Sequence, residues 1–168
     1  MLVYHPAFDF HHTVFRILLI LETLPQSAYE VDRIRILDFY FLFPAELADI
    51  RYPRGVRVQR RLIEEKHNKY EQLLDRYQLL MRMEPYQMEA LRCLASHDLI
   101  SVEDLKSSLV TRTERAAPQR LEEAFRVAED GRPIALSLLT GPLKDLRLHG
   151  KDGLRGRTEL IGYRYDAS

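Results

Sequence analysis

The feature that most constrains the fold is an amino-terminal stretch in which apolar residues recur at the spacing of a helix face. Its members are Phe10, Val14, Ile17, Leu18 and Leu21. Further apolar residues between them widen this face, so the pattern predicts a helix over 10–24 that is buried on several sides. Asp9 is a candidate N-cap for this helix, and Pro25 ends it.

A second apolar helix is expected directly after the first. Ser27–Glu30 has the capping-box pattern, in which the serine oxygen accepts a backbone N–H and the glutamate reaches back, so this helix would begin near Tyr29. Its apolar pattern runs to Phe43, where Pro44 ends it. The two stretches together predict an amino-terminal helical hairpin. Over 57–83 a mixture of polar and apolar residues predicts one or two helices with a charged outer face.

The carboxyl-terminal half repeats a pattern of short helices joined by tight turns. Pro85 would open one helix, Ser101 would cap a second, and Pro118 would open a third. Three such helices over about 85–130 are typical of a winged-helix or helix-turn-helix module. The apolar run 134–139 that follows fits either a strand or a short helix.

These patterns predict a mainly α protein with a small β wing, in which the amino-terminal hairpin packs on a winged-helix-like module. We expect a single compact domain over 1–168, with a helical part at 1–83 and the winged-helix-like part at 84–168. The net charge is zero, and Cys93 has no second cysteine to pair with, which fits a reducing compartment. The longest apolar run, 17–21, is too short to cross a bilayer, so we expect a cytoplasmic protein without membrane contact.

The carboxyl-terminal segment Gly150–Tyr165 has the composition of a recognition surface. It holds four glycines, four basic residues and two tyrosines in sixteen positions. Glycine permits positive φ and close approach of backbones, whereas arginine and tyrosine carry hydrogen-bonding groups on large side chains. Two compatible interpretations remain open: a β-hairpin wing whose glycines serve its turns, and an edge that binds a partner.

A basic stretch follows the predicted hairpin. Five arginines lie within eleven residues with no acidic residue among them: Arg51, Arg54, Arg57, Arg60 and Arg61. Such cations neutralise nucleic-acid phosphates, pair with an acidic partner or stay solvated, and the sequence leaves all three open. The candidates for contact with nucleic acid or an acidic partner are Arg54, Arg57, Arg60 and Arg61.

No constellation in the sequence predicts catalysis, a metal site or a cofactor. His5, Asp9, His11 and His12 are residue types that bind metals. However, successive histidines point about 100° apart on a helix, so they do not converge on one ion. Cys93 and His97 are one helical turn apart, but a third, orienting group is missing. We therefore predict a protein that is not an enzyme; turnover that is lost on changing either residue would contradict this.

Two stretches together resemble a known family. They are Tyr4–Asp9 followed by His12–Arg16, and Gly150–Asp166. Both are similar to the middle component of ABC-three-component defence systems, the group that includes Lamassu. The resemblance implies a small accessory subunit that works beside a coiled-coil, SMC-like ABC ATPase and an effector, often a nuclease, in bacterial immunity against phages and plasmids.

The main hypothesis is therefore a non-catalytic adaptor whose two terminal segments bind the ATPase or the effector. The candidate partner-binding residues are Tyr4, His5, Phe8, Asp9, Leu154, Arg155, Arg157, Thr158, Tyr163, Arg164 and Tyr165. The alternative is a stand-alone winged-helix DNA-binding regulator that reads DNA with Arg120 and Arg126. Acidic residues in the same predicted helix would repel phosphates, which counts against this alternative.

Overall fold

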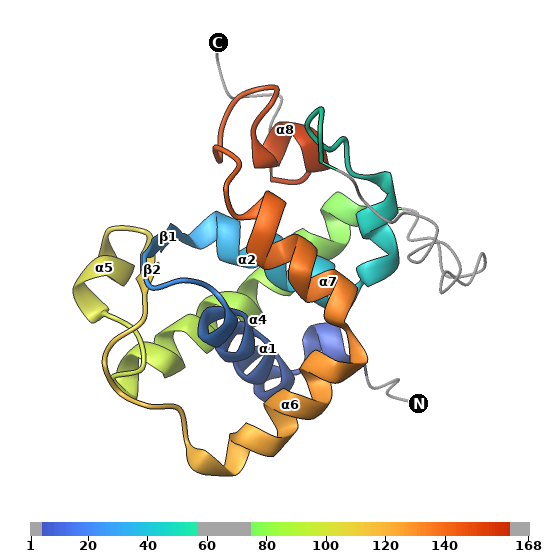
Figure 1. Ribbon diagram of the computed structural model, residues 1–168. Coiled ribbons are helices and arrows are strands. Elements are labelled where there is room, and N and C mark those ends of the chain that lie inside the picture. Colours follow the sequence, from blue (N-terminus) through green and yellow to red (C-terminus); the bar gives the residue numbers. More distant parts are fainter. Residues whose placement is uncertain (1–4, 57–74, 162–168) are drawn as a thin grey trace.

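The central element of the fold is the helix α1 (Phe10–Thr23). The computed structural model describes residues 5–56 and 75–161, and Figure 1 shows α1 in the middle of the molecule. Its main neighbours are α4 (Arg76–Ser96) and α2 (Val31–Leu42). The prediction of a buried amino-terminal helix is confirmed, since residues 17–21 are all at most 3% exposed.

The start of α1 is set by local hydrogen bonding, as the sequence predicts. The Asp9 carboxylate accepts a hydrogen bond from the His12 backbone N–H at 2.8 Å, which satisfies a donor that the helix itself leaves unpaired. A short 3₁₀ turn, η1 (Pro6–Phe8), precedes this cap and packs against α1 and α4.

The second helix begins later than the capping-box pattern predicts. Ala28–Glu30 forms a strand, β1, that pairs antiparallel with β2 (Leu109–Thr111), and α2 starts only at Val31. The Val31 N–H, which a cap would have satisfied, donates to the Ser108 carbonyl at 3.0 Å. The predicted start near Tyr29 is wrong because pairing with a distant strand satisfies the backbone instead. The predicted end holds, since α2 stops at Leu42 and η2 (Pro44–Asp49) follows.

The helix predicted to open at Pro85 is also wrong, because this proline lies inside α4. Proline lacks the N–H that would bond the carbonyl four residues earlier, here that of Met81. Both residues lie on the exposed side of the helix, where water can take the place of the missing donor. The opposite side, with Leu80, Met83 and Leu91, is buried and keeps the helix continuous. Residues 57–74 lie outside the described part of the chain.

The remaining elements are short helices joined by turns. Ser101 caps α5 (Val102–Lys106), as predicted, by accepting a hydrogen bond from the Asp104 N–H at 3.2 Å. The elements that follow β2 are η3 (Gln119–Leu121), α6 (Glu122–Gly131), α7 (Pro133–Leu138), the irregular turn η4 (Leu139–Leu143) and α8 (Leu154–Thr158). The open choice between strand and helix after residue 133 is resolved as helix α7.

The fold is mainly helical with one small sheet in the described residues, as predicted. Each strand of that sheet comes from a different half of the sequence, because β1 follows α1 and β2 follows α5. The predicted β-hairpin wing is wrong over the described part of the segment, since residues 154–158 form α8. The described elements do not confirm a winged-helix arrangement. One apolar core runs through both halves and includes Ile17, Leu37, Leu91 and Leu139.

Candidate partner interface

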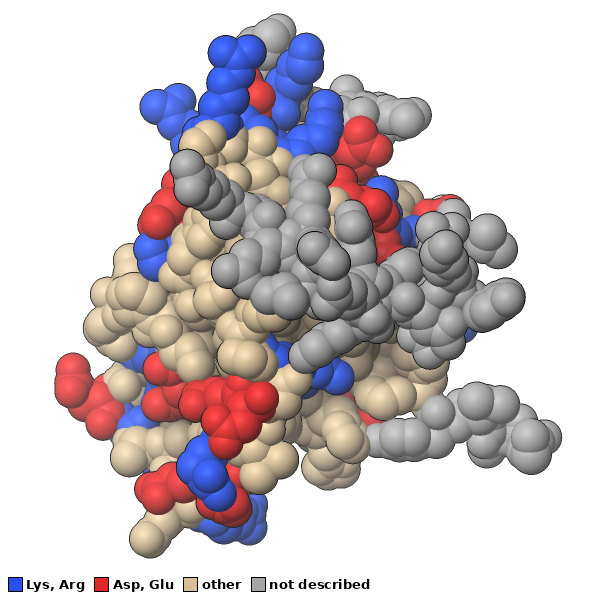
Figure 2. Space-filling model, turned by 45° about the vertical axis from the view of Figure 1, so that its right-hand side comes forward, with Lys and Arg blue, Asp and Glu red and all other residues tan. Residues whose placement is uncertain are grey.

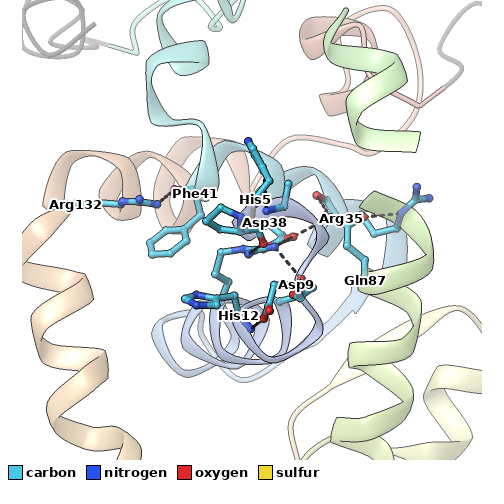
Figure 3. Close-up of polar contacts among 12 residues, drawn as sticks. His5, Asp9, His12, Arg35, Asp38, Phe41, Gln87 and Arg132 are labelled. Atoms are coloured by element: carbon cyan, nitrogen blue, oxygen red, sulfur yellow. Dashed lines mark hydrogen bonds and ion pairs between the residues drawn. The ribbon is translucent and has the colours of Figure 1, made fainter. Parts of the chain in front are cut away.

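A buried polar network positions the amino-terminal elements. Asp38 is completely buried and accepts two hydrogen bonds from the Arg16 guanidinium, at 2.6 and 3.1 Å, and one from the Gln87 amide at 2.9 Å. Gln87 in turn accepts a hydrogen bond from Arg35 at 3.2 Å. Figure 3 shows Asp38 facing Arg35 and Gln87, so the network joins α2 to α4. Arg16 also donates to the Pro6 carbonyl at 2.9 Å, which fixes η1 on α1.

The predicted partner-binding residues of the amino-terminal segment lie together at η1. The His5 ring accepts the Ala7 N–H at 3.1 Å, and its centroid lies 5.5 Å from that of Phe8. Asp9 caps α1, and the backbone N–H of His12 lowers the pKa of this carboxyl. Figure 3 shows Asp9 beside His12 at the start of the helix. Tyr4 lies outside the described residues.

These residues continue onto the outer face of α4. Phe8 is half-buried, its ring lies 5.9 Å from that of Tyr86, and the Arg82 guanidinium lies 4.8 Å above it. On the same helix, Tyr77 and Met81 are 40% and 37% exposed. We call this set the η1–α4 face: Phe8, Tyr77, Met81, Arg82 and Tyr86. Its two exposed apolar residues were not among the sequence candidates, although their spacing of four residues could have indicated one helix face.

The carboxyl-terminal candidates split into two groups, and the first is buried. Leu154 is 0% and Thr158 3% exposed, so neither offers surface in this structure. The helix that carries them packs tightly on the preceding loop. A Cβ on Gly153 would lie 2.1 Å from the His149 carbonyl oxygen, and one on Gly156 would lie 2.4 Å from that of Lys151. The glycines therefore permit close backbone approach, which is one of the two roles that the sequence suggests.

The second group consists of two arginines that anchor α8 to the rest of the protein. Arg155 donates to the Asp32 carboxylate of α2 and, at 3.3 Å, to the His149 ring. Arg157 donates to the Arg51 carbonyl at 2.6 Å and to the Asp152 carboxylate at 3.1 Å. Both guanidiniums thus have internal partners. Tyr163, Arg164 and Tyr165 lie outside the described residues, so the proposed role of the whole segment stays a prediction.

The basic stretch is described only at its start. Arg54 is exposed in the turn that ends at Val56, and Arg57, Arg60 and Arg61 lie outside the described residues. Two further exposed cations, Arg147 and Lys151, lie in the loop before α8. Sequence reasoning did not group these two cations with Arg54, because nothing in the sequence shows that both loops contact α8.

An open cleft of about 510 Å³ lies between β1 and residues 144–147. Its lining includes Tyr29, whose pKa is raised by burial, and Glu30, whose pKa is lowered by a hydrogen bond from Arg33. Arg33 also donates to the Lys144 carbonyl at 2.8 Å. The buried cation of the cleft is therefore neutralised within the protein.

The residues considered for catalysis, metal binding and DNA reading come next. His97 Nδ1 lies 3.8 Å from the Cys93 sulfur but 2.9 Å from the Cys93 carbonyl oxygen. Across 5–56 and 75–161, no three His, Cys, Asp or Glu side chains form a group that could hold a metal ion.

Arg126, a candidate DNA reader, is paired with Glu123 at 2.5 Å, a contact that raises its pKa, and with Asp130 at 3.6 Å. This pairing opposes phosphate binding by α6.

The fold defines a small, mainly helical protein, with exposed aromatic, apolar and basic side chains on η1 and α4 and exposed cations in the loops around α8. The sequence matches the family described as ABC-three component (ABC-3C) system Middle Component 5 over residues 2–166, and the chain belongs to this family. The resemblance seen in its terminal segments is thereby confirmed at the level of the middle component. As a middle component of a multi-subunit defence system, the chain has partner subunits. No curated protein and no solved structure matches it.

Within the described part of the chain, none of the helices combines the length and the apolar character needed to span a membrane.

Proposed function

We propose that this protein is a non-catalytic accessory subunit that joins an SMC-like ABC ATPase to its effector in a Lamassu-like antiphage and antiplasmid system in the cytoplasm. The observation that carries the proposal is the η1–α4 face, together with membership of a middle-component family. The partner that occupies this face is a protein component of the same system.

The composition of the η1–α4 face supports a protein partner. Aromatic residues, methionine and arginine are enriched at the centres of protein interfaces, and this face contains all three. Tyr77 and Met81 expose apolar surface on the first turns of α4, and Phe8, Arg82 and Tyr86 contact one another further along the same helix. A preorganised surface loses little side-chain entropy when it binds.

The rigid support of this face is a second argument. Arg16 holds η1 through the Pro6 carbonyl, and its charge is balanced by Asp38 inside the protein. Asp38 is in turn bonded to Gln87 of α4. Both elements of the face are therefore tied to one buried network, so that Phe8 and Met81 keep a fixed relative position.

Co-expression with the other components of the system tests the proposal. A tagged form of the full chain is expected to retain the ATPase or the effector through affinity purification and gel filtration. Recovery of a folded chain that joins neither component would refute the proposal. In the same strains, Cys93→Ala and His97→Ala are expected to leave protection against phage unchanged, whereas a loss of protection in complexes that still assemble would indicate chemistry in this subunit.

A further inference from the structure

Two loops that are distant in the sequence both contact α8 at one end of the molecule, through Arg157. The first carries Arg51 and Arg54, and the second carries Arg147 and Lys151. Arg157 of α8 donates to the Arg51 carbonyl at 2.6 Å, and the Arg51 guanidinium donates to the Gly156 carbonyl. Figure 1 shows α8 and α6 at opposite ends, and Figure 2 shows Lys and Arg side chains gathered at the α8 end.

The cations at this end fall into paired and unpaired groups. Arg155, Arg157 and Lys144 pair with Asp32, Asp152 and Asp145, and Arg51 lies 3.7 Å from Glu159. In the part of the chain that the structure describes, no carboxylate lies within ion-pair distance of the other three exposed cations. We call these three the α8 cation set: Arg54, Arg147 and Lys151. All three side chains are exposed, and Arg147 lines the open cleft together with Glu30 and Asp145. Exposed cations without an ion-pair partner attract an anion from outside the protein.

The backbone that carries Arg147 and Lys151 is held in one conformation. The Leu154 and Arg155 N–H groups donate to the Arg147 and Leu148 carbonyls at 2.6 and 3.1 Å. Gly153 donates to the Gly150 carbonyl at 3.0 Å, which closes the turn around Lys151. This loop therefore presents its cations from a fixed support, and binding an anion does not require the loop to be ordered first.

The surroundings of the α8 cation set favour phosphates over a protein partner. Protein interfaces have an apolar centre, but the exposed large apolar residues of the described chain lie elsewhere. They are Tyr77, Met81, Val102 and Val127. Arginine matches the geometry of phosphate oxygens, and a surface of separate cations matches a repeating anionic backbone better than a single small anion.

We infer that the α8 cation set binds the phosphate backbone of duplex DNA without reading its sequence. The three cations each neutralise a phosphate and release condensed counterions. This activity lies on a different surface from the η1–α4 face, so the protein can contact a component of its system and DNA at the same time.

Fluorescence anisotropy with a labelled 20-base-pair duplex of random sequence (about two helical turns) measures this binding for the full chain at several salt concentrations. The test variant is Arg54→Gln, Arg147→Gln and Lys151→Gln combined. Its matched control is Arg92→Gln, Lys106→Gln and Arg115→Gln combined, which removes three exposed cations that have carboxylate partners within the protein. Both variants lose the same charge.

Each neutralised phosphate contributes about 0.9 to the slope of log affinity against log salt, so the test variant is expected to lose about 2.7 of the wild-type slope. Between about 50 and 200 mM salt, the wild-type affinity then falls roughly 40-fold more than that of the test variant. The control is expected to keep the wild-type slope.

Three results would overturn the inference. The first is that the wild type does not bind the duplex at the lowest salt concentration, and the second is that the test and control variants have equal salt slopes. The third is that polyglutamate displaces the duplex as efficiently as unlabelled duplex does, a result that would assign the surface to an acidic protein. Co-purification of the test variant with the other components is measured in parallel. Because that assay reports the η1–α4 face, failure of DNA binding and failure of the proposed function are distinguishable.

Discussion

Replacing Asp38 by asparagine is expected to destabilise the protein more than any change at an exposed carboxylate. The Asp38 side chain is 0% exposed and that of its partner Arg16 5% exposed, so the substitution leaves a buried guanidinium without its counter-charge. The new amide also turns an N–H group toward donors from Arg16 or Gln87. Breaking a buried ion pair in this way costs about 3–5 kcal/mol.

The loss of stability can be measured by urea unfolding, monitored by circular dichroism. With a urea dependence of about 2 kcal/mol per molar, the unfolding midpoint of Asp38→Asn is expected to fall by about 1.5–2.5 M. The control is Asp130→Asn, at an exposed carboxylate 3.6 Å from Arg126, and its midpoint is expected to stay close to that of the wild type.

A double-mutant cycle separates the ion pair from general disruption of the core. Removing both charges in Arg16→Met combined with Asp38→Leu is expected to cost less than the sum of the two single changes, with a coupling free energy of about 2 kcal/mol. Additive costs, or an Asp38→Asn midpoint indistinguishable from that of Asp130→Asn, would refute the reasoning that a charged pair organises this core.

Two further predictions concern the α8 segment and the cleft. Gly156→Ala brings a Cβ to within 2.4 Å of the Lys151 carbonyl oxygen and is expected to lower the free energy of unfolding by about 1–3 kcal/mol. The control Gly131→Ala, whose new Cβ has no atom within 4 Å, is expected to be neutral or stabilising in the same urea assay. Equal effects of the two substitutions would contradict the close packing of α8. The pKa of Glu30 is lowered from 4.5 by its hydrogen bond from Arg33, so this contribution to stability is present above 4.5 and is lost as the pH falls through the lowered pKa. Urea midpoints from about pH 6 to about pH 3 are therefore expected to show the advantage of the wild type over Glu30→Gln shrinking with acid, and an advantage that grows would contradict the assigned direction.

The parts of the fold that follow from local interactions could be predicted from the sequence. Asp9 and Ser101 cap their helices because each side chain reaches the N–H three residues further along. The start of α2 could not be predicted in this way. It depends on the pairing of Tyr29 with Val110, and no local pattern indicates a partner so far along the chain. The continuity of α4 through Pro85 likewise depends on burial of its opposite face.

The candidate sites show the same division. The glycines of the carboxyl-terminal segment correctly indicated close backbone approach, because that property belongs to the residue type. Whether an arginine is available to a partner depends instead on what the fold places beside it. Arg155 pairs with Asp32, which is 123 positions away, whereas no carboxylate in the described part of the chain lies within ion-pair distance of Arg147. Composition alone does not separate these two cases.

The most direct test of the central claim is co-purification of η1–α4 face variants with the other components of the system. Tyr77→Asp combined with Met81→Asp places two charges on the exposed apolar part of this face, whereas Val127→Asp alters the 59% exposed residue of α6. The double variant is expected to fold, as judged by an unfolding midpoint close to that of the wild type, but no longer to co-elute with the ATPase or the effector. Val127→Asp is expected to co-elute normally. Assembly that survives the double variant would contradict the claim that this face joins the subunit to its complex.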